Sequence, residues 1–261
     1  MIITSKDNDL IKHIKKLKEK KHRDETNSFI IEGVKIIEEA IDENADIEKI
    51  VVCNEINEEF SKELLYKIAK YDVIYVSKNI FKLLTDVTNP QGILAVISKK
   101  QNTLVDFTKD FYLILDNIQD PGNMGTILRT ADSINLNQII IRQGSVDCYN
   151  PKVVRATMGA IFRVNIVESK DMVKTIKELK KHKIKIYATD LKTEKNIYSA
   201  DYKKSAVIIG NESNGVSEEL LDLADEKIKI PMLGKTESLN AGVATGIILY
   251  EVIRKKNYDS K

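Results

Sequence analysis

Three separated segments in the second half of the chain place glycine and polar residues where a plain hydrophobic core would not. They span residues 117–130, 209–216 and 230–241, and all three lead into helical patterns. Two of them directly follow apolar, β-branched runs. Loops at the carboxyl ends of strands are where α/β proteins bind their ligands. Three such loops therefore predict one composite site.

Strand-like and helix-like patterns alternate along the whole chain, which predicts an α/β fold. With 261 residues, of which 43% are hydrophobic, the chain is long enough for two domains. Residues 99–109 are polar and aperiodic. We expect a smaller N-terminal α/β domain over 1–98, a linker over 99–109 and a larger domain over 110–261. The continuously apolar runs 112–115 and 206–209 are typical of a parallel sheet covered on both faces.

Helices are expected over residues 5–23 and, behind the three polar segments, over 123–135, 216–222 and 238–256. The last of these contains Gly242 and Gly246 within its apolar spacing. Each interior glycine costs about 1 kcal/mol relative to alanine. The helix therefore approaches another element closely. That element is either a ligand or second copy of the chain, or the protein's own sheet.

The first segment combines a turn, a helix start and an arginine. Residues 120–122, Asp-Pro-Gly, form the turn, and Asn123 is a natural N-cap. The free amides of such a helix start can hold an anion, and Arg129 would add a planar fork of donors. The alternative is that Arg129 pairs with an acidic residue of its own domain.

The second and third segments each carry polar residues that admit a functional and a structural interpretation. Glu212 follows a buried strand and Gly210, so it is either a functional carboxylate or a cap for the next helix. Ser238 is a natural N-cap for the last helix. Asn240 would then lie inside the first turn, where asparagine is less expected on structural grounds. We therefore treat Glu212 and Asn240 as candidate site residues at this point.

A basic block near the N-terminus predicts contact with nucleic acid. Residues 11–23 carry seven Lys or Arg against one Glu, although the whole chain has a net charge of only +2. Phosphate binding depends on local charge density. The alternative is a solvated amphipathic helix. The candidate nucleic-acid-binding residues of this block are Lys15, Lys16, Lys20, Lys21 and Arg23.

Several other classes of function and location are disfavoured. Neither the two cysteines nor the three histidines have metal-ligand spacing, so no metal is expected. The N-terminus is charged too early for a signal peptide, and no uncharged apolar stretch approaches about 18 residues. We expect a cytoplasmic protein with no membrane contact. The absence of G-x-G-x-x-G, Walker A and G-x-S-x-G motifs disfavours hydride transfer, phosphoryl transfer and serine hydrolysis.

Taken together, the three segments resemble the three motifs of the SpoU (TrmH-type) branch of the SPOUT RNA methyltransferases. The matching stretches are 120–131, 209–216 and 230–241, and the resemblance covers roughly 111–256. Two departures concern small residues: Ser213, where the family often has glycine, and the stretch 241–243, where valine commonly follows the asparagine. They leave the chemistry of the motifs intact.

The N-terminal half resembles the substrate-binding domain of the ribosomal RNA members of this family. The supporting residues are Ser5, Asn8, the lysine-rich block and the stretch 29–35. This half of the match is the less specific one. The extra domain favours ribosomal RNA over transfer RNA as the substrate.

The resemblance implies S-adenosylmethionine-dependent methylation of a ribose 2′-hydroxyl in RNA. It also implies a C-terminal trefoil knot, a homodimer and an active site near the dimer interface. Its catalytic set, carried over by motif, is Arg129, Asn123, Glu212, Ser238 and Asn240. Its cofactor set is Thr189, Gly210, Ile230 and Leu239. The alternatives are a transfer RNA 2′-O-methyltransferase, an inactive RNA-binding module and an ordinary nucleotide-dependent enzyme, which the missing glycine fingerprint disfavours.

Overall fold

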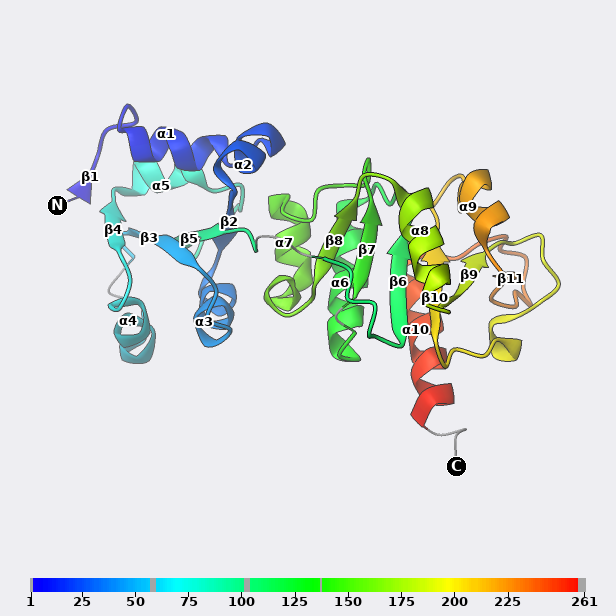
Figure 1. Ribbon diagram of the computed structural model, residues 1–261. Coiled ribbons are helices and arrows are strands. Elements are labelled where there is room, and N and C mark those ends of the chain that lie inside the picture. Colours follow the sequence, from blue (N-terminus) through cyan, green and yellow to red (C-terminus); the bar gives the residue numbers. More distant parts are fainter. Residues whose placement is uncertain (1, 57–59, 101–103, 137, 258–261) are drawn as a thin grey trace. The chain divides into compact units, whose positions relative to one another are not determined.

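The computed structural model describes residues 2–56, 60–100, 104–136 and 138–257 (Figure 1). The chain folds into two compact units. Unit 1 comprises Met1–Gln101 and Asp147–Phe162, and unit 2 comprises Asn102–Val146 and Arg163–Lys261. The sequence pattern had kept 110–261 together as one domain. The domain boundaries stay a prediction.

Unit 1 is built on a five-stranded mixed sheet. The strands are β1 (Ile2–Ile3), β2 (Ser28–Glu32), β3 (Ile47–Cys53), β4 (Val73–Val76) and β5 (Ile93–Ser98). Their order is β1-β4-β3-β5-β2. The strands β1, β4 and β3 pair in parallel, whereas β5 pairs antiparallel with both β3 and β2.

The helices of unit 1 are α1 (Asp9–Lys16), α2 (Lys20–Thr26), α3 (Val34–Asp42), α4 (Lys62–Ile68), α5 (Lys78–Leu84), α7 (Pro151–Thr157) and the 3₁₀ turn η2 (Ala160–Phe162). Helices α1 and α5 lie on one face of the sheet, and α3 and α4 lie on the other (Figure 1). Helix α1 buries Ile11 and Ile14 in one cluster with Phe81 of α5. Because these apolar residues recur at helical spacing, α1 leaves its lysines on the opposite, solvated face.

The single helix expected over 5–23 is wrong, because the basic block forms two helices. Helix α1 ends at its C-cap Leu17, and Glu19 before α2 has an extended backbone. The carbonyl groups of Leu17 and Lys18 accept hydrogen bonds from the Arg23 guanidinium at 2.8 and 2.7 Å. Arg23 therefore satisfies the acceptors that a continuing helix would have used.

Unit 2 is built on a six-stranded sheet in which every adjacent pair of strands is parallel. The strands are β6 (Phe111–Leu115), β7 (Ile139–Arg142), β8 (Ile166–Ser169), β9 (Lys185–Thr189), β10 (Ser205–Ile209) and β11 (Glu226–Ile228). Their order is β11-β9-β10-β6-β7-β8. Every residue of β6 and β10 is buried. The predicted α/β fold with a parallel sheet is thereby confirmed.

Helices of unit 2 pack in two pairs. The elements are α6 (Pro121–Ser133), α8 (Met172–Lys181), the 3₁₀ turn η3 (Ile197–Ser199), α9 (Glu218–Leu223) and α10 (Ala241–Asn257). Helices α8 and α9 share a core with alternate residues of the central strands, including Ile114 and Ile208. Helix α10 packs against α6. A methyl group on Gly242 would approach the Thr126 Cγ2 atom of α6 to 3.2 Å, so this glycine permits the close packing of the two helices.

Two of the expected helix caps are corrected by the structure. Asp120, not Asn123, caps α6, because its carboxylate accepts from the Asn123 amide at 2.8 Å. Asn240, not Ser238, caps α10, because its Oδ1 atom accepts from the Gly242 and Val243 amides. The side chain of Asn123 is thereby released from capping its own helix and is available for contacts elsewhere.

Candidate functional site

A cavity of about 660 Å³ lies in unit 2 at the carboxyl ends of β9, β10 and β11. The second and third polar segments contribute much of its wall. The four residues expected to hold a cofactor all line it, namely Thr189, Gly210, Ile230 and Leu239. Glu212 and Ser238 line it as well. Its volume is within the usual range of small-molecule sites, about 300–1,000 Å³.

The loop after β10 has its shape because of one glycine. A Cβ atom on Gly210 would lie 2.0 Å from the carbonyl carbon of Gly215, so no other residue fits there without moving the loop. The loop returns on itself through two backbone hydrogen bonds between Asn211 and Gly215, of 3.0 and 2.9 Å. Gly215 has a φ of +69°, a conformation that L side chains rarely adopt. The backbone of this loop thus forms one wall of the cavity.

Three side chains connect the three polar segments directly. The Asn240 Nδ2 atom donates to the Asn123 Oδ1 atom at 2.8 Å. The Asn123 Nδ2 atom donates in turn to the Glu212 Oε1 atom at 2.6 Å. Asn123 is only 8% exposed. A buried amide that donates to a carboxylate makes a strong, charge-assisted contact. These two hydrogen bonds therefore fix the three segments relative to one another.

Arg129 differs from the other candidates because it lies on the exposed surface of α6. Within the described part of the chain, the structure shows no hydrogen bond or ion pair for its guanidinium. The alternative in which Arg129 pairs with an acidic residue of its own domain therefore has no support among those residues. All five donors of the guanidinium are available to a ligand.

Ser238 is also exposed, and it lies outside α10 on the segment that lines the cavity. The structural interpretation of Ser238 as a helix cap is excluded by the position of Asn240. Its hydroxyl is therefore available to a ligand of the cavity or its rim.

The four candidate lysines of the N-terminal basic block lie at the surface of unit 1. Lys15 and Lys16 are on α1, and Lys20 and Lys21 are on α2. Lys20 forms an ion pair with Asp24 at 2.7 Å, and Lys21 lies 3.9 Å from a carboxylate oxygen of Glu25. Exposed pairs of this kind contribute little to stability. These two pairs therefore hold Lys20 and Lys21 only weakly.

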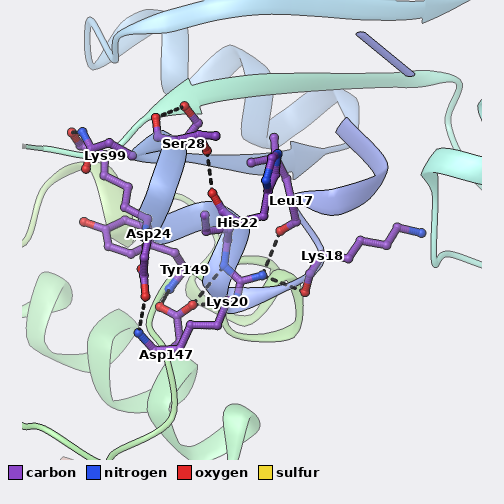
Figure 2. A network of polar contacts seen from close by, with 12 residues as sticks. Leu17, Lys18, Lys20, His22, Asp24, Ser28, Lys99, Asp147 and Tyr149 are labelled. Carbon is purple, nitrogen blue, oxygen red and sulfur yellow. Dashed lines mark hydrogen bonds and ion pairs between the residues drawn. The ribbon is translucent and has the colours of Figure 1, made fainter. Parts of the chain in front are cut away.

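Arg23 behaves in the opposite way and is removed from the expected RNA-binding set. Its side chain is 2% exposed. Figure 2 shows the partners that hold it: the Nε and Nη2 atoms donate to the Asp147 Oδ2 atom at 2.9 and 2.6 Å. The Nη1 atom donates to the carbonyl groups of Leu17 and Lys18. Sequence reasoning missed Asp147, since its position 124 residues away leaves no local signal.

Across residues 2–56, 60–100, 104–136 and 138–257, no three His, Cys, Asp or Glu side chains are grouped as a metal ion would need. Among the helices of those same stretches, none has both the length and the apolar character needed to cross a bilayer.

Comparison with protein families gives two matches. Residues 110–250 match the model of the SpoU rRNA methylase family. Residues 8–95 match an MRM3-like substrate-binding domain. The two matches lie on either side of the polar stretch 99–109.

Similar proteins and structures span nearly the whole chain. The 23S rRNA (guanosine(2553)-2′-O)-methyltransferase RlmP of Bacillus subtilis is 34% identical over 96% of this chain and 98% of its own. The mitochondrial rRNA methyltransferase 3A of Danio rerio is 30% identical over 88% of this chain and 64% of its own. The crystal structure of an AdoMet-bound rRNA methyltransferase from Sinorhizobium meliloti superimposes with a TM-score of 0.84, at 30% identity, over 98% of both chains.

Proposed function

The chain belongs to the SpoU rRNA methylase family, and from this premise we propose that it methylates a guanosine ribose of 23S ribosomal RNA. As a member of this family it is an S-adenosylmethionine-dependent methyltransferase that modifies a ribose 2′-hydroxyl of ribosomal RNA. The observation that carries the proposal is the Asn240–Asn123–Glu212 chain of hydrogen bonds beside the cavity. It connects all three family motifs at one place.

The cavity has the features that S-adenosylmethionine requires. Apolar side chains such as Leu239 and Ile248 can enclose an adenosine, and the loop held by Gly210 offers backbone groups at close range. Asp190 and Lys192 both line the cavity. Side chains of both signs suit a ligand that carries a cationic sulfonium, an amino group and a carboxylate. We propose Thr189, Gly210, Ile230 and Leu239 as the residues that hold it.

When bound, the cofactor supplies a methyl group on a positively charged sulfur. An oxygen nucleophile can attack this methyl group and displace the sulfur. The protein's own contribution is then mainly alignment, because an in-line displacement is sensitive to the angle and distance of attack. The hydrogen-bonded Asn123, Glu212 and Asn240 form a rigid surface on which a ribose can be oriented. Ser238, which also lines the cavity, adds a hydroxyl.

We propose that Arg129 stabilises the charge that develops on the ribose oxygen as its proton leaves. A guanidinium stays protonated in proteins, so a role as a literal base is unfavourable. A fixed cation next to a developing alkoxide lowers the barrier instead. The exposed, unpaired position of Arg129 within the described residues supports this role, because no protein acceptor competes with the substrate.

We further propose that the chain acts as a cytoplasmic homodimer with a C-terminal trefoil knot, as its motifs imply. Val243 and Tyr250 of α10 are 51% and 56% exposed, and Arg129 is exposed on the neighbouring helix α6. Apolar side chains on that surface support pairing with a second copy, which would bring Arg129 close to an interface. Sedimentation of the purified protein tests the dimer.

The substrate assignment has a direct test. A 23S rRNA transcript incubated with the protein and S-adenosylmethionine is expected to gain one 2′-O-methyl guanosine, at the position equivalent to 2553 of the Bacillus subtilis relative. Mapping of 2′-O-methyl marks by primer extension at low nucleotide concentration locates it. Methylation of transfer RNA in place of 23S rRNA would contradict the proposal.

A further inference from the structure

A charged network lies at the carboxyl ends of β6 and β7, where it contacts Ser217 directly after the loop 210–216. The Asp116 Oδ1 atom accepts from the Arg142 Nη1 atom at 3.0 Å, and its Oδ2 atom accepts from the Ser217 amide at 2.7 Å. The Arg142 Nη1 atom also donates to the Ser217 hydroxyl at 2.9 Å. The Nη2 atom of the same arginine donates to Glu219. The network therefore joins two strands to the start of α9.

Asp116 is deeply buried, with only 1% of its surface exposed. A buried carboxylate is tolerated only when it is paired and hydrogen-bonded, and here both oxygens have partners. Burial by itself would lower the pKa of the Arg142 guanidinium, but the hydrogen bonds and charges of Asp116 and Glu219 outweigh it and raise that pKa. The contact is thus a fixed ion pair.

The network holds one end of the loop 210–216, because it binds Ser217, the residue that directly follows the loop. The other end is held from the same turn, because the Asn211 Nδ2 atom donates to the carbonyl of Asn117 at 2.9 Å. Asn117 has a φ of +60° and directly follows Asp116. Two neighbouring residues at the end of β6 therefore anchor both ends of the loop.

This loop has two tasks in the proposed methylation site. Its backbone lines the cavity, and its Glu212 side chain accepts the hydrogen bond from Asn123. The backbones of Gly210 and Gly215 lie so close that a Cβ atom on Gly210 would be 2.0 Å from the Gly215 carbonyl carbon. We therefore expect a displacement of Ser217 to move the cavity wall and Glu212 together.

We propose that Asp116 and Arg142 are positioning residues that set the loop 210–216 for cofactor binding and for methyl transfer. This inference rests on the proposed function of the same site. Neither residue needs to touch a substrate. Both act through the backbone and hydroxyl of Ser217.

The test compares two arginines of unit 2 whose side chains are nearly equally exposed. The Arg142 side chain is 31% exposed and pairs with Asp116. Arg163 is 30% exposed and holds an ion pair with Asp132 at 3.0 Å, and neither Arg163 nor Asp132 is among the residues that line the cavity. Lysine in place of arginine keeps the charge but loses the planar fork. Arg142→Lys and Arg163→Lys are therefore matched variants.

We expect Arg142→Lys to raise the Kd for S-adenosylmethionine and to lower kcat, each by roughly 10- to 100-fold. Small misplacements of reacting groups carry penalties of this size. The same loss is expected in Asp116→Asn. Arg163→Lys should leave both constants within about twofold, since ordinary surface changes have small effects. Calorimetry with the cofactor alone, single-turnover methylation and thermal unfolding are measured on all variants.

Equal changes of cofactor Kd and kcat in Arg142→Lys and Arg163→Lys would overturn the positioning role. If Asp116→Asn does not fold, Ser217→Ala gives a milder probe, because it removes only the hydroxyl contact of 2.9 Å. It should shift the cofactor Kd in the same direction with an unchanged unfolding temperature. A wild-type protein that neither binds cofactor nor methylates RNA would instead contradict the proposed function itself.

Discussion

Two arginines that the sequence marks as candidate site residues, one RNA-binding and one catalytic, have opposite surroundings. Arg23, in the basic block of unit 1, is 2% exposed and uses its Nε, Nη1 and Nη2 atoms within the protein. Arg129, on α6 of unit 2, is exposed and has no ion-pair partner among the described residues. The difference shows that a cationic residue in a basic run serves the fold when its donors are satisfied internally. A cationic residue whose donors are left open, such as Arg129, is free to bind a ligand.

The same contrast separates the chemistry of the two regions. In unit 1 the arginine ends one helix and joins it to Asp147, which Figure 2 labels, while the four candidate lysines Lys15, Lys16, Lys20 and Lys21 stay exposed. In unit 2, Asn123, Glu212 and Asn240 hold one another by hydrogen bonds, and Arg129 takes no part in these contacts. Substitutions in the two regions should therefore affect different measurements.

The largest effect is expected for Arg129→Ala. Loss of the cation beside the developing alkoxide should lower kcat by about 100- to 1,000-fold, the usual range for removal of one stabilising donor. Cofactor Kd and unfolding temperature should stay close to wild type, because Arg129 forms no ion pair within the described residues. Single-turnover methylation measures the loss of turnover, and calorimetry measures the cofactor Kd. Retained turnover would contradict the assigned role.

A large effect of a different kind is expected for Arg23→Met. It should lower the free energy of unfolding by about 3–5 kcal/mol, because Asp147 is left with an uncompensated and largely buried charge. Urea unfolding measures it, and Lys21→Met on the exposed side of α2 is the control. The added substitution Asp147→Asn should recover part of the loss. A loss no larger than that of Lys21→Met would contradict a structural role for Arg23.

A moderate effect is expected when Lys15 and Lys16 are both changed to Glu. RNA affinity should fall, and the slope of log Kd against log salt should flatten by about one for each phosphate that is no longer bound. Lys174 and Lys177, which are exposed on α8, allow the same change of charge in unit 2. Titrations at several salt concentrations compare the two double variants. Equal slopes would favour the solvated-helix alternative for the basic block.

The smallest effect is expected on stability when the pH is lowered through the range in which histidine titrates. His13 and His22 share one contact of 3.0 Å between their ring nitrogens. Burial and the charge of His22 lower the pKa of His13, while Glu48 opposes this. The unfolded chain therefore takes up the His13 proton first as pH falls. Stability is full above the ordinary histidine pKa of about 6.5 and declines below it, toward the lowered folded value.

Replacement by glutamine tests this directly. Urea midpoints of wild type and His13→Gln at about pH 7.5, 6.5 and 5.5 are compared, and the variant should show the flatter decline. Glu32, whose pKa burial raises, contributes with the opposite sign in both proteins and cancels in the difference. Identical declines in the two proteins would contradict the account of His13.

Much of the fold could be read from the sequence, because long apolar runs such as 111–115 leave few alternatives to a buried parallel strand. The helix caps could not. Asp120 and Asn123 are both natural caps three positions apart, and so are Ser238 and Asn240 two positions apart. Local preference does not choose between them. Long-range contacts place Asn123 against Asn240 and Glu212, and Arg23 against Asp147, and neither contact leaves a local signal.

A crystal structure of the protein soaked with S-adenosylhomocysteine tests the central claim most directly. The ligand is expected in the cavity of unit 2, against Gly210, Ile230 and Leu239, with its sulfur on the side of Asn123 and Glu212. A ligand bound outside that cavity, with the cavity left empty, would contradict the account.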